Sequence, residues 1–334
     1  MNNKKGNVFA IGICFFLFAM ISFVTGLQNP MGIIAKAQFG ATNLMSQLGN
    51  AANFIAYAFM GLPAGFLLKG RGYKAEVDYY HSATLAHENV EWEHIFPNAK
   101  FEQSSKWDVF VTGGGSSIFS KIRRRFLRKT CSICYMPTAF SADIPSNEDV
   151  REYIFGVFQN AKMADEVKDE VQKRFTFVPF ESGQNKKYME EMMRSESVGI
   201  HIRKGKDYTS RIWYQNTCSM EYYRNAIRLM KERLHAPRFY VFTDNPQWVK
   251  EHFEGIEYTL VEGNPPFGWG SHFDMQLMSY CKHNIISNST YSWWGAFLNK
   301  NPEKIVILPR QWFNPESCEE STSEKVQCEG WIAL

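Results

Sequence analysis

Two segments of this chain carry the residue types that hold a diphosphate. Residues 197–203 are typical of a buried strand, and basic residues end or follow it: His201, Arg203, Lys204 and Lys206. A second buried strand is expected at 283–287, followed by a hydroxyl-rich turn and the start of a helix. The first N–H groups of a helix attract phosphate, and basic side chains complete such a clamp. The two segments therefore predict an enzyme that handles a nucleotide diphosphate.

The side chains at these positions suit separate tasks. Arg203 can direct two N–H groups at one phosphate and would stabilise the charge that builds on a leaving diphosphate. The alternative is an arginine that simply follows a strand at the surface. His201 shares a strand face with Arg203, because side chains alternate, and it would contact the base or ribose unless its role is structural. Hydroxyl groups of the turn would donate to the phosphates, although helix capping explains one of them equally well.

Several segments resemble bacterial α-1,2-fucosyltransferases, which form glycosyltransferase family 11. Residues 201–208, His-Ile-Arg-Lys-Gly-Lys-Asp-Tyr, are similar to the family's His-x-Arg-Arg-Gly-Asp-Tyr motif, with one residue inserted before the aspartate. Residues 274–295 are similar to a signature that ends in Asn-Ser-Thr-x-Ser-Trp-Trp-Gly. Residues 240–245 and 308–312 are similar to two further strands and their exits, and the resemblance extends over residues 72–314.

The resemblance implies transfer of L-fucose from GDP-β-L-fucose to the 2-hydroxyl group of a terminal galactose, with inversion at the anomeric carbon. It implies that Asp274 accepts hydrogen bonds from the guanine base, where a helix cap is the alternative interpretation. Arg203 and Asp207 are the predicted catalytic residues, with Asp207 as the base. The predicted nucleotide-sugar-binding residues are His201, Arg203, Asp274, Asn288, Ser289, Thr290 and Ser292. Because the sequence contains no Asp-x-Asp, we expect a reaction without a metal or cofactor.

The carboxyl-terminal half alternates between strands and helices. We expect strands at 197–203, 238–243, 257–261, 283–287 and 304–308, and helices at 219–233, 246–253, 273–280 and 292–299. This alternation predicts an α/β fold with a parallel, doubly wound sheet whose ligand lies at the carboxyl ends of the strands. We expect the GDP-fucose-binding domain at 191–316 and a tail at 317–334. The resemblance implies a GT-B-like pair of Rossmann-type domains, in which residues 75–190 form a truncated acceptor-side domain.

The first part of the chain is hydrophobic. Residues 8–27 form a nearly continuous apolar run that is long enough to cross a bilayer as a helix. Residues 47–68 form a second candidate span. Basic residues lie before the first span and after the second. The positive-inside rule then places both chain ends in the cytoplasm. We expect a protein of the bacterial inner membrane with a cytoplasmic catalytic domain.

The stretch 6–74 more closely resembles the first two helices of a major-facilitator fucose permease than the usual start of the transferase family. A fusion near residue 72 would explain this, and a diverged transferase start is the alternative. The glycine-rich loop with which the family begins would then be missing. The competing functional hypothesis is therefore a catalytically impaired fusion product that only binds GDP.

Composition limits the remaining function classes. The net charge is only +3, so the sequence does not indicate a nucleic-acid partner. Seven cysteines, an odd number, are typical of a reducing compartment without a disulfide framework. The expected partners are GDP-fucose, a galactose-terminated glycan and the lipid bilayer.

Overall fold

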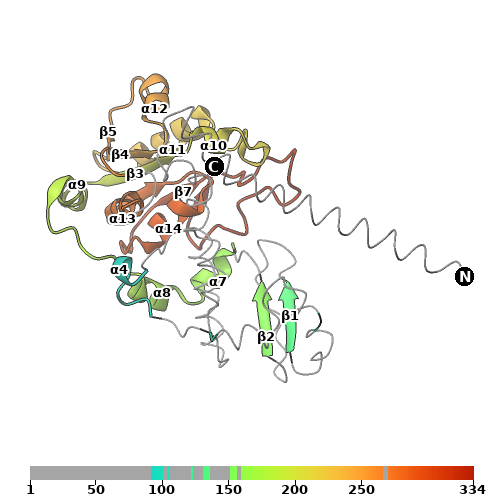
Figure 1. Cartoon of the computed structure of the whole chain (residues 1–334). Coiled ribbons are helices and arrows are strands. Elements are labelled where there is room, and N and C mark those ends of the chain that lie inside the picture. The colour runs from blue at the N-terminus through green and yellow to red at the C-terminus, as the bar shows by residue number, and fades with distance from the viewer. Residues whose placement is uncertain are drawn as a thin grey trace, which may run out of the picture. The chain divides into compact units, whose positions relative to one another are not determined.

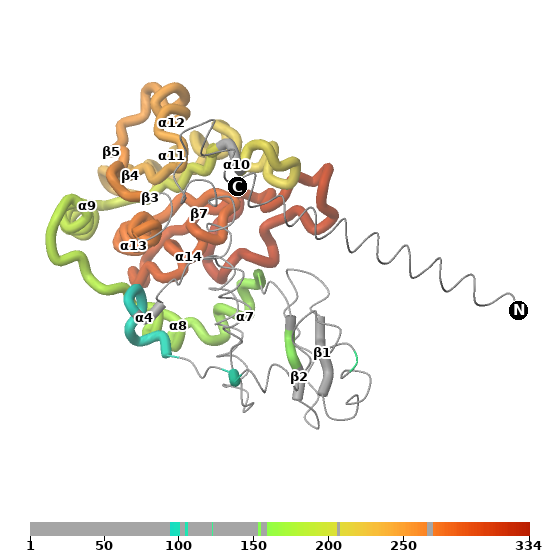
Figure 2. Tube along the Cα trace, viewed as in Figure 1, coloured from blue at the N-terminus to red at the C-terminus, as the bar shows by residue number. Residues whose placement is uncertain are grey.

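The computed structural model describes residues 92–100, 104–105, 122, 131–135, 151–155, 159–265 and 270–334 (Figures 1 and 2). Every described residue belongs to one compact unit, residues 53–334. The predicted membrane spans at 8–27 and 47–68, like the whole permease-like segment, lie outside the described residues. Among the residues that are described, no helix has the length and apolar character needed to cross a bilayer.

A parallel sheet lies at the centre of residues 159–334 (Figure 1). Within the described residues it has six strands, in the order β5-β4-β3-β6-β7-β8. These are β3 (Ser197–Ile202), β4 (Arg238–Thr243), β5 (Thr259–Leu260), β6 (His283–Ile285), β7 (Val306–Leu308) and β8 (Ile332–Ala333). Every pairing between them is parallel. The chain builds outward from β3 to β5, then returns to β6 on the other side of β3. This is the doubly wound order, and its switch point lies between β3 and β6.

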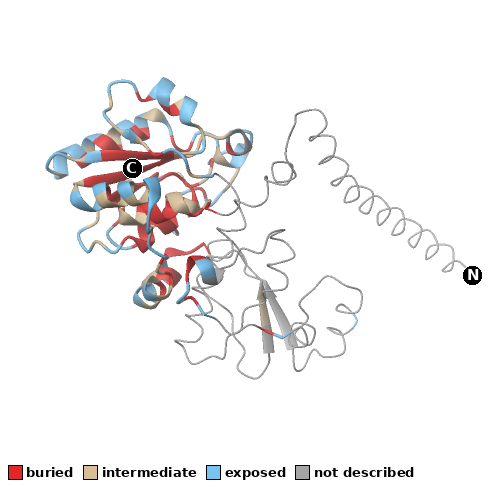
Figure 3. Ribbon diagram, turned by 60° about the vertical axis from the view of Figure 1, so that its left-hand side comes forward, coloured by how far each residue is buried: buried red, intermediate tan, exposed pale blue. Residues whose placement is uncertain are grey.

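The predicted parallel, doubly wound sheet is thus confirmed. β3 is buried along its whole length, as expected for a central strand covered on both faces. In β4 the side chains alternate between two cores: Phe239 and Val241 pack on one face, and Tyr240 and Phe242 on the other. Figure 3 shows the buried strands enclosed by helices.

The helices cover the two faces of this sheet (Figure 1). One core includes buried residues of α11 (Met220–Arg233) and α12 (Pro246–His252). The other includes residues of α9 (Gly183–Arg194), α13 (Phe273–Tyr280) and α14 (Thr290–Leu298). The predicted cap of α11 is confirmed, because the Ser219 hydroxyl accepts a hydrogen bond from the N–H of Tyr222. α13 and α14 pack closely at Gly295, where an added Cβ would lie 2.9 Å from the Cβ of Met278.

Segments assigned from sequence to the first domain join the second domain's core. Three short helices lie in these segments: α4 (Trp92–Ile95), α7 (Ala161–Asp165) and α8 (Lys168–Arg174). Buried residues of all three belong to the core that also contains α9, α13 and α14. The ring of Phe96 lies 5.1 Å from that of Phe175, which lies 6.0 Å from that of Trp294. The described part of the predicted first domain also contains a separate parallel pair, β1 (Cys131–Tyr135) and β2 (Arg151–Phe155). Described residues on both sides of the predicted boundary near residue 190 thus share one hydrophobic core, and the division into domains stays a prediction.

The structure also differs from the predicted tail at 317–334. These residues end in β8, the outermost strand of the sheet, and the ring of Trp331 lies 5.6 Å from that of Trp293. The segment has no apolar alternation that would indicate a strand. Its two-residue strand is stabilised by pairing with β7 and by burial of Trp331, both of which are tertiary effects.

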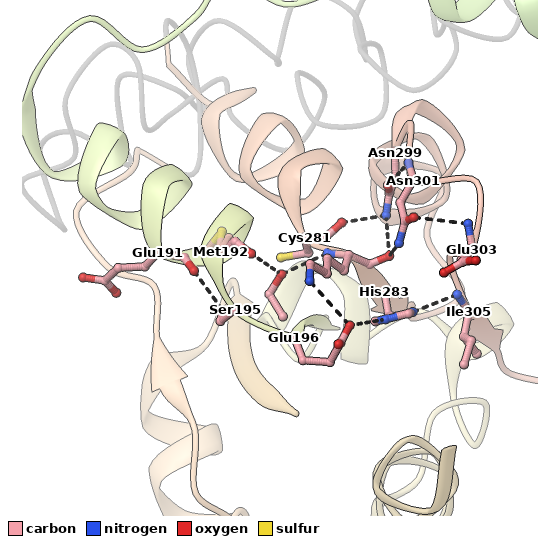
Figure 4. A network of polar contacts seen from close by, with 12 residues as sticks. Glu191, Met192, Ser195, Glu196, Cys281, His283, Asn299, Asn301, Glu303 and Ile305 are labelled. Carbon is pink, nitrogen blue, oxygen red and sulfur yellow. Dashed lines mark hydrogen bonds and ion pairs between the residues drawn. The ribbon is translucent and has the colours of Figure 1, made fainter. Parts of the chain in front are cut away.

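A polar network ties the amino ends of the central strands together (Figure 4). The Nε2 atom of His283 lies 3.0 Å from a carboxylate oxygen of Glu196, and its Nδ1 accepts the N–H of Ile305 at 3.0 Å. The hydroxyl of Ser197 accepts the N–H of Lys282 at 2.9 Å. These contacts join β3, β6 and β7 at one edge of the sheet, so that their carboxyl ends are held in register at the other.

Candidate functional site

The predicted site lies between the carboxyl ends of β3 and β6. His201, near the end of β3, has its Nδ1 atom 2.8 Å from the Oγ of Ser287, which follows β6. Both side chains are buried. The contact crosses the switch point of the sheet, where doubly wound folds bind their ligands. The structure therefore brings together the two segments that the sequence singled out.

His201 is uncharged in this environment. Burial, reinforced by the positive charge of Arg203, lowers its pKa to about 3. A neutral imidazole has one N–H donor and one acceptor nitrogen. Because Nδ1 is engaged with Ser287, Nε2 is the atom through which His201 would contact a ligand. The ring of Tyr291 lies 5.7 Å from the imidazole.

Arg203 directly follows β3 and is held on two sides. Its Nε lies 3.8 Å from a carboxylate oxygen of Asp244, and its guanidinium carbon lies 5.1 Å from the centre of the Tyr208 ring. Its side chain is 19% exposed. An ion pair and an aromatic face together restrict the orientation of a long side chain. Arg203 is therefore preorganised at the strand edge where a phosphate would bind.

Asp244, which the site prediction left out, organises this edge. One of its oxygens accepts the N–H groups of Lys204 at 2.7 Å and Gly205 at 2.8 Å, while the other faces Arg203. The neighbouring Asn245 side chain also donates to the carbonyl of Lys204 at 3.0 Å. One carboxylate thus fixes both the backbone after β3 and the arginine. A signal was present in the sequence, since an acidic residue ends the strand beside β3.

Lys204 does not take the role predicted for it in the phosphate clamp. Its ammonium group donates to the carbonyl of Cys218 at 2.8 Å and lies 5.3 Å from the Trp248 ring. It therefore holds the loop before α11. Lys206 and Asp207 lie in α10 (Lys206–Thr209), and their side chains lie outside the described part of the structure. The predicted base is consequently placed by its backbone only.

The turn before α14 presents an uncapped helix end. Ser289 occupies the N-cap position, but its side chain makes no capping bond. Its hydroxyl oxygen is buried and has no hydrogen-bond partner within the described chain. The first N–H groups of any helix lack acceptors inside the helix. An anion at this point would accept hydrogen bonds from both the hydroxyl and these N–H groups.

The other residues of the turn differ in what they reach. Ser292 is fully buried, and its hydroxyl donates to the carbonyl of Ser289 at 3.1 Å. The Asn288 side chain donates to the carbonyl of Trp312 at 2.9 Å and accepts the hydroxyl of Tyr208. These two side chains shape the turn from inside. Thr290 is partly exposed as the first residue of α14.

Asp274 lies in the first turn of α13, beside the same site. Its carboxylate accepts the Asn264 side-chain amide at 2.7 Å, and Asn264 in turn accepts from Asn185 at 2.7 Å. Burial raises the pKa of Asp274 to about 6. The hydroxyl of Tyr291 accepts the N–H of Met275 at 2.9 Å, which joins the starts of α13 and α14. The helix cap proposed as an alternative is not seen, since the N-cap of α13 is His272.

Sequence comparison relates this region to known transferases. Residues 139–334 match glycosyl transferase family 11. The chain is 32% identical over 195 residues to an alpha-1,2-colitosyltransferase of Escherichia coli, which covers 56% of this chain and 64% of that protein. It is 36% identical over 143 residues to the O-antigen biosynthesis glycosyltransferase WbnK of Escherichia coli, covering 42% of this chain and 45% of the relative.

A more distant relative is galactoside alpha-(1,2)-fucosyltransferase 1 of Leontocebus fuscicollis, with 28% identity over 107 residues, or 30% of this chain and 28% of that protein. The chain spans less than two thirds of the length of these relatives. The family match begins at residue 139, so the permease-like stretch lies outside it. Because the match covers more than half of the chain, this protein belongs to glycosyl transferase family 11.

Proposed function

We propose that this glycosyltransferase moves L-fucose from GDP-β-L-fucose to the 2-hydroxyl group of a terminal galactose, with inversion. Family membership supports the reaction class. The α-1,2 linkage is supported by the names of a bacterial and a primate relative, and galactose as acceptor by the primate one. The donor and acceptor follow from the resemblance of residues 201–208 and 274–295 to fucosyltransferase motifs.

The observation that carries the proposal is the uncapped end of α14, which Tyr208 links to Arg203 by contacting both Arg203 and Asn288. The Ser289 hydroxyl, which has no partner in the described chain, and the helix N–H groups would provide donors on one side of a diphosphate. Arg203, held by Asp244, provides a fixed guanidinium. As the bond from fucose to the diphosphate breaks, negative charge grows on the β-phosphate. Donors that are fixed in advance stabilise that charge more in the transition state than in the ground state.

Recognition of the guanine base is proposed for Asp274. An ionised carboxylate accepts two parallel hydrogen bonds, which suits the N1–H and N2–H groups of guanine. The amide of Asn264 already orients this carboxylate. The pKa of about 6 keeps it ionised at neutral pH. His201, uncharged and facing the same site, is proposed to contact the base or ribose through Nε2.

The proton of the acceptor hydroxyl must pass to a base opposite the leaving group. We assign this task to Asp207 from its place in the motif after β3. We also propose that the reaction needs no metal, because Arg203 and the α14 helix end would offset the phosphate charge. The membrane spans expected at 8–27 and 47–68 would anchor the enzyme on the cytoplasmic face of the inner membrane.

Nucleotide-linked colitose is a second candidate donor, favoured by the 32% identity to an alpha-1,2-colitosyltransferase. Both donors can be offered to the full chain with a galactose-terminated acceptor, and the linkage of the product read by NMR. We expect a fucosyl-α-1,2-galactose product with GDP-fucose. Faster turnover of the colitose donor would reassign the donor. Binding of GDP without turnover of either donor would favour the catalytically impaired fusion product instead.

A further inference from the structure

An exposed apolar pair lies beside the proposed phosphate site. Ile212 and Trp213, in the 3₁₀ helix η2 (Ile212–Tyr214), are 55% and 52% exposed. Single exposed apolar residues are ordinary, but an exposed Trp is typical of surfaces that contact a partner. We call Ile212 and Trp213 the η2 patch.

The backbone of the η2 patch is held in place although its side chains face solvent. Asn314, which is buried, donates its backbone N–H to the carbonyl of Trp213 at 2.7 Å and its side-chain amide to that of Ile212 at 3.0 Å. Tyr214 stacks on Tyr208, with ring centres 4.5 Å apart and planes within 2°. An aromatic side chain on a fixed backbone has few rotatable bonds, so it binds a ligand at low cost in conformational entropy.

The same contacts connect the η2 patch to the phosphate-binding residues. Tyr208, on which Tyr214 stacks, has its ring 5.1 Å from the guanidinium carbon of Arg203. Its hydroxyl donates to Asn288, the residue before Ser289. Trp213 is therefore the chain neighbour of Tyr214, and the two stacked rings of Tyr214 and Tyr208 lead from there to Arg203. The η2 patch thus adjoins a connected group of side chains that includes Arg203 and the turn before α14.

We propose that the η2 patch binds the acceptor glycan, an inference that rests on the function proposed above. One face of a galactose ring carries apolar C–H groups, which pack on an aromatic ring, while its hydroxyl groups remain in solvent. Two side chains bury too little area for a stable protein–protein interface, which takes about 1,200 Å² or more, whereas they match the size of one or two sugar rings. The size of the η2 patch therefore favours a glycan over a protein partner.

The test compares Trp213→Ala with Trp213→Phe and with Met193→Ala, a control at a 58% exposed apolar residue of α9. Steady-state kinetics with a galactose-terminated acceptor should show an acceptor KM raised about tenfold by Trp213→Ala, the loss of roughly 1.4 kcal/mol of binding. The KM for GDP-fucose and the hydrolysis of GDP-fucose without acceptor should not change. Trp213→Phe should recover most of the affinity, and Met193→Ala should match wild type.

Saturation-transfer NMR of the same acceptor with the GDP-bound protein measures binding without turnover. Loss of the NMR signal in Trp213→Ala supports the inference, whether or not the wild-type protein turns over a donor. Absence of turnover in wild type would count against the proposed function alone. Equal acceptor KM and equal NMR signal in wild type and Trp213→Ala would overturn the inference. The inference would also be overturned if sedimentation showed a dimer for wild type and a monomer for Trp213→Ala, since the η2 patch would then join two copies of the chain.

Discussion

Replacing Ser289 by alanine should have opposite effects on stability and on nucleotide binding. A serine at an N-cap normally stabilises its helix, and its replacement by alanine costs about 0.5–2 kcal/mol. Here the side chain makes no capping bond, and its hydroxyl is buried without a partner in the described chain. A buried unsatisfied polar group costs about 1–3 kcal/mol, and the alanine removes that cost while losing only one oxygen atom of packing. The free energy of unfolding should therefore stay equal or rise by about 1 kcal/mol.

The affinity for GDP should fall in the same variant. A hydrogen bond from a hydroxyl to a charged phosphate contributes about 1.5–3 kcal/mol. Its loss corresponds to a dissociation constant raised about tenfold to a hundredfold. Substitution of a residue with only a structural role would lower the GDP affinity only if it also lowered the free energy of unfolding. The combination of signs therefore identifies Ser289 as a ligand-binding residue.

Urea unfolding and titration calorimetry with GDP measure the two effects. Ser292→Ala is the matched control, because this hydroxyl lies in the same turn but donates to the carbonyl of Ser289. It should lower the free energy of unfolding by about 0.5–1.5 kcal/mol and weaken GDP binding less than Ser289→Ala does. The reasoning would be refuted if Ser289→Ala destabilised the protein by more than about 1 kcal/mol and left the GDP affinity unchanged.

Three further predictions follow from other contacts. Asp244→Asn should lower kcat about tenfold or more, because it releases Arg203. Glu251→Gln, on the exposed face of α12, should leave kcat unchanged. A kcat of Asp244→Asn equal to that of wild type would argue against a positioning role for Asp244. Because the pKa of Asp274 is raised to about 6, GDP affinity should fall as the pH drops below 6, and Asp274→Asn should bind GDP weakly at every pH. A raised carboxyl pKa also means that stability is lost as pH rises from about 4 to 6, so Asp274→Asn should unfold at a higher urea concentration than wild type at pH 8; a lower midpoint would contradict this sign. Gly295→Ala should cost about 1–3 kcal/mol in unfolding free energy, because its Cβ would lie 2.9 Å from that of Met278, and an unchanged midpoint would show that the two helices separate easily.

The central sheet was largely predictable because its strands are regular and flanked by clear signals. The predicted strand 238–243 and the predicted helix 273–280 have the observed bounds. β6 ends two residues before its predicted bound, and β7 begins two residues after its own. β8 was not predictable, because a two-residue strand has no periodicity and depends on a neighbour far along the chain.

The two segments that meet between β3 and β6 were singled out from sequence, but the directions of their individual side chains were not predictable. Arg203 and Lys204 follow β3, where the alternation of side chains along a strand no longer applies. Lys204 contacts the carbonyl of Cys218, whereas Arg203 contacts the carboxylate of Asp244. Ser289 and Ser292 are of the same type in the same turn. Only the three-dimensional arrangement shows that one hydroxyl is satisfied and the other has no partner in the described chain.

The most direct test of the central claim, that the switch point between β3 and β6 binds the diphosphate, is a structure of this protein with GDP. We predict phosphate oxygens within about 3 Å of the Ser289 hydroxyl and of the Arg203 guanidinium, with the guanine base at Asp274. A complex in which the phosphates lie elsewhere, and Ser289 and Arg203 contact no part of GDP, would contradict the account.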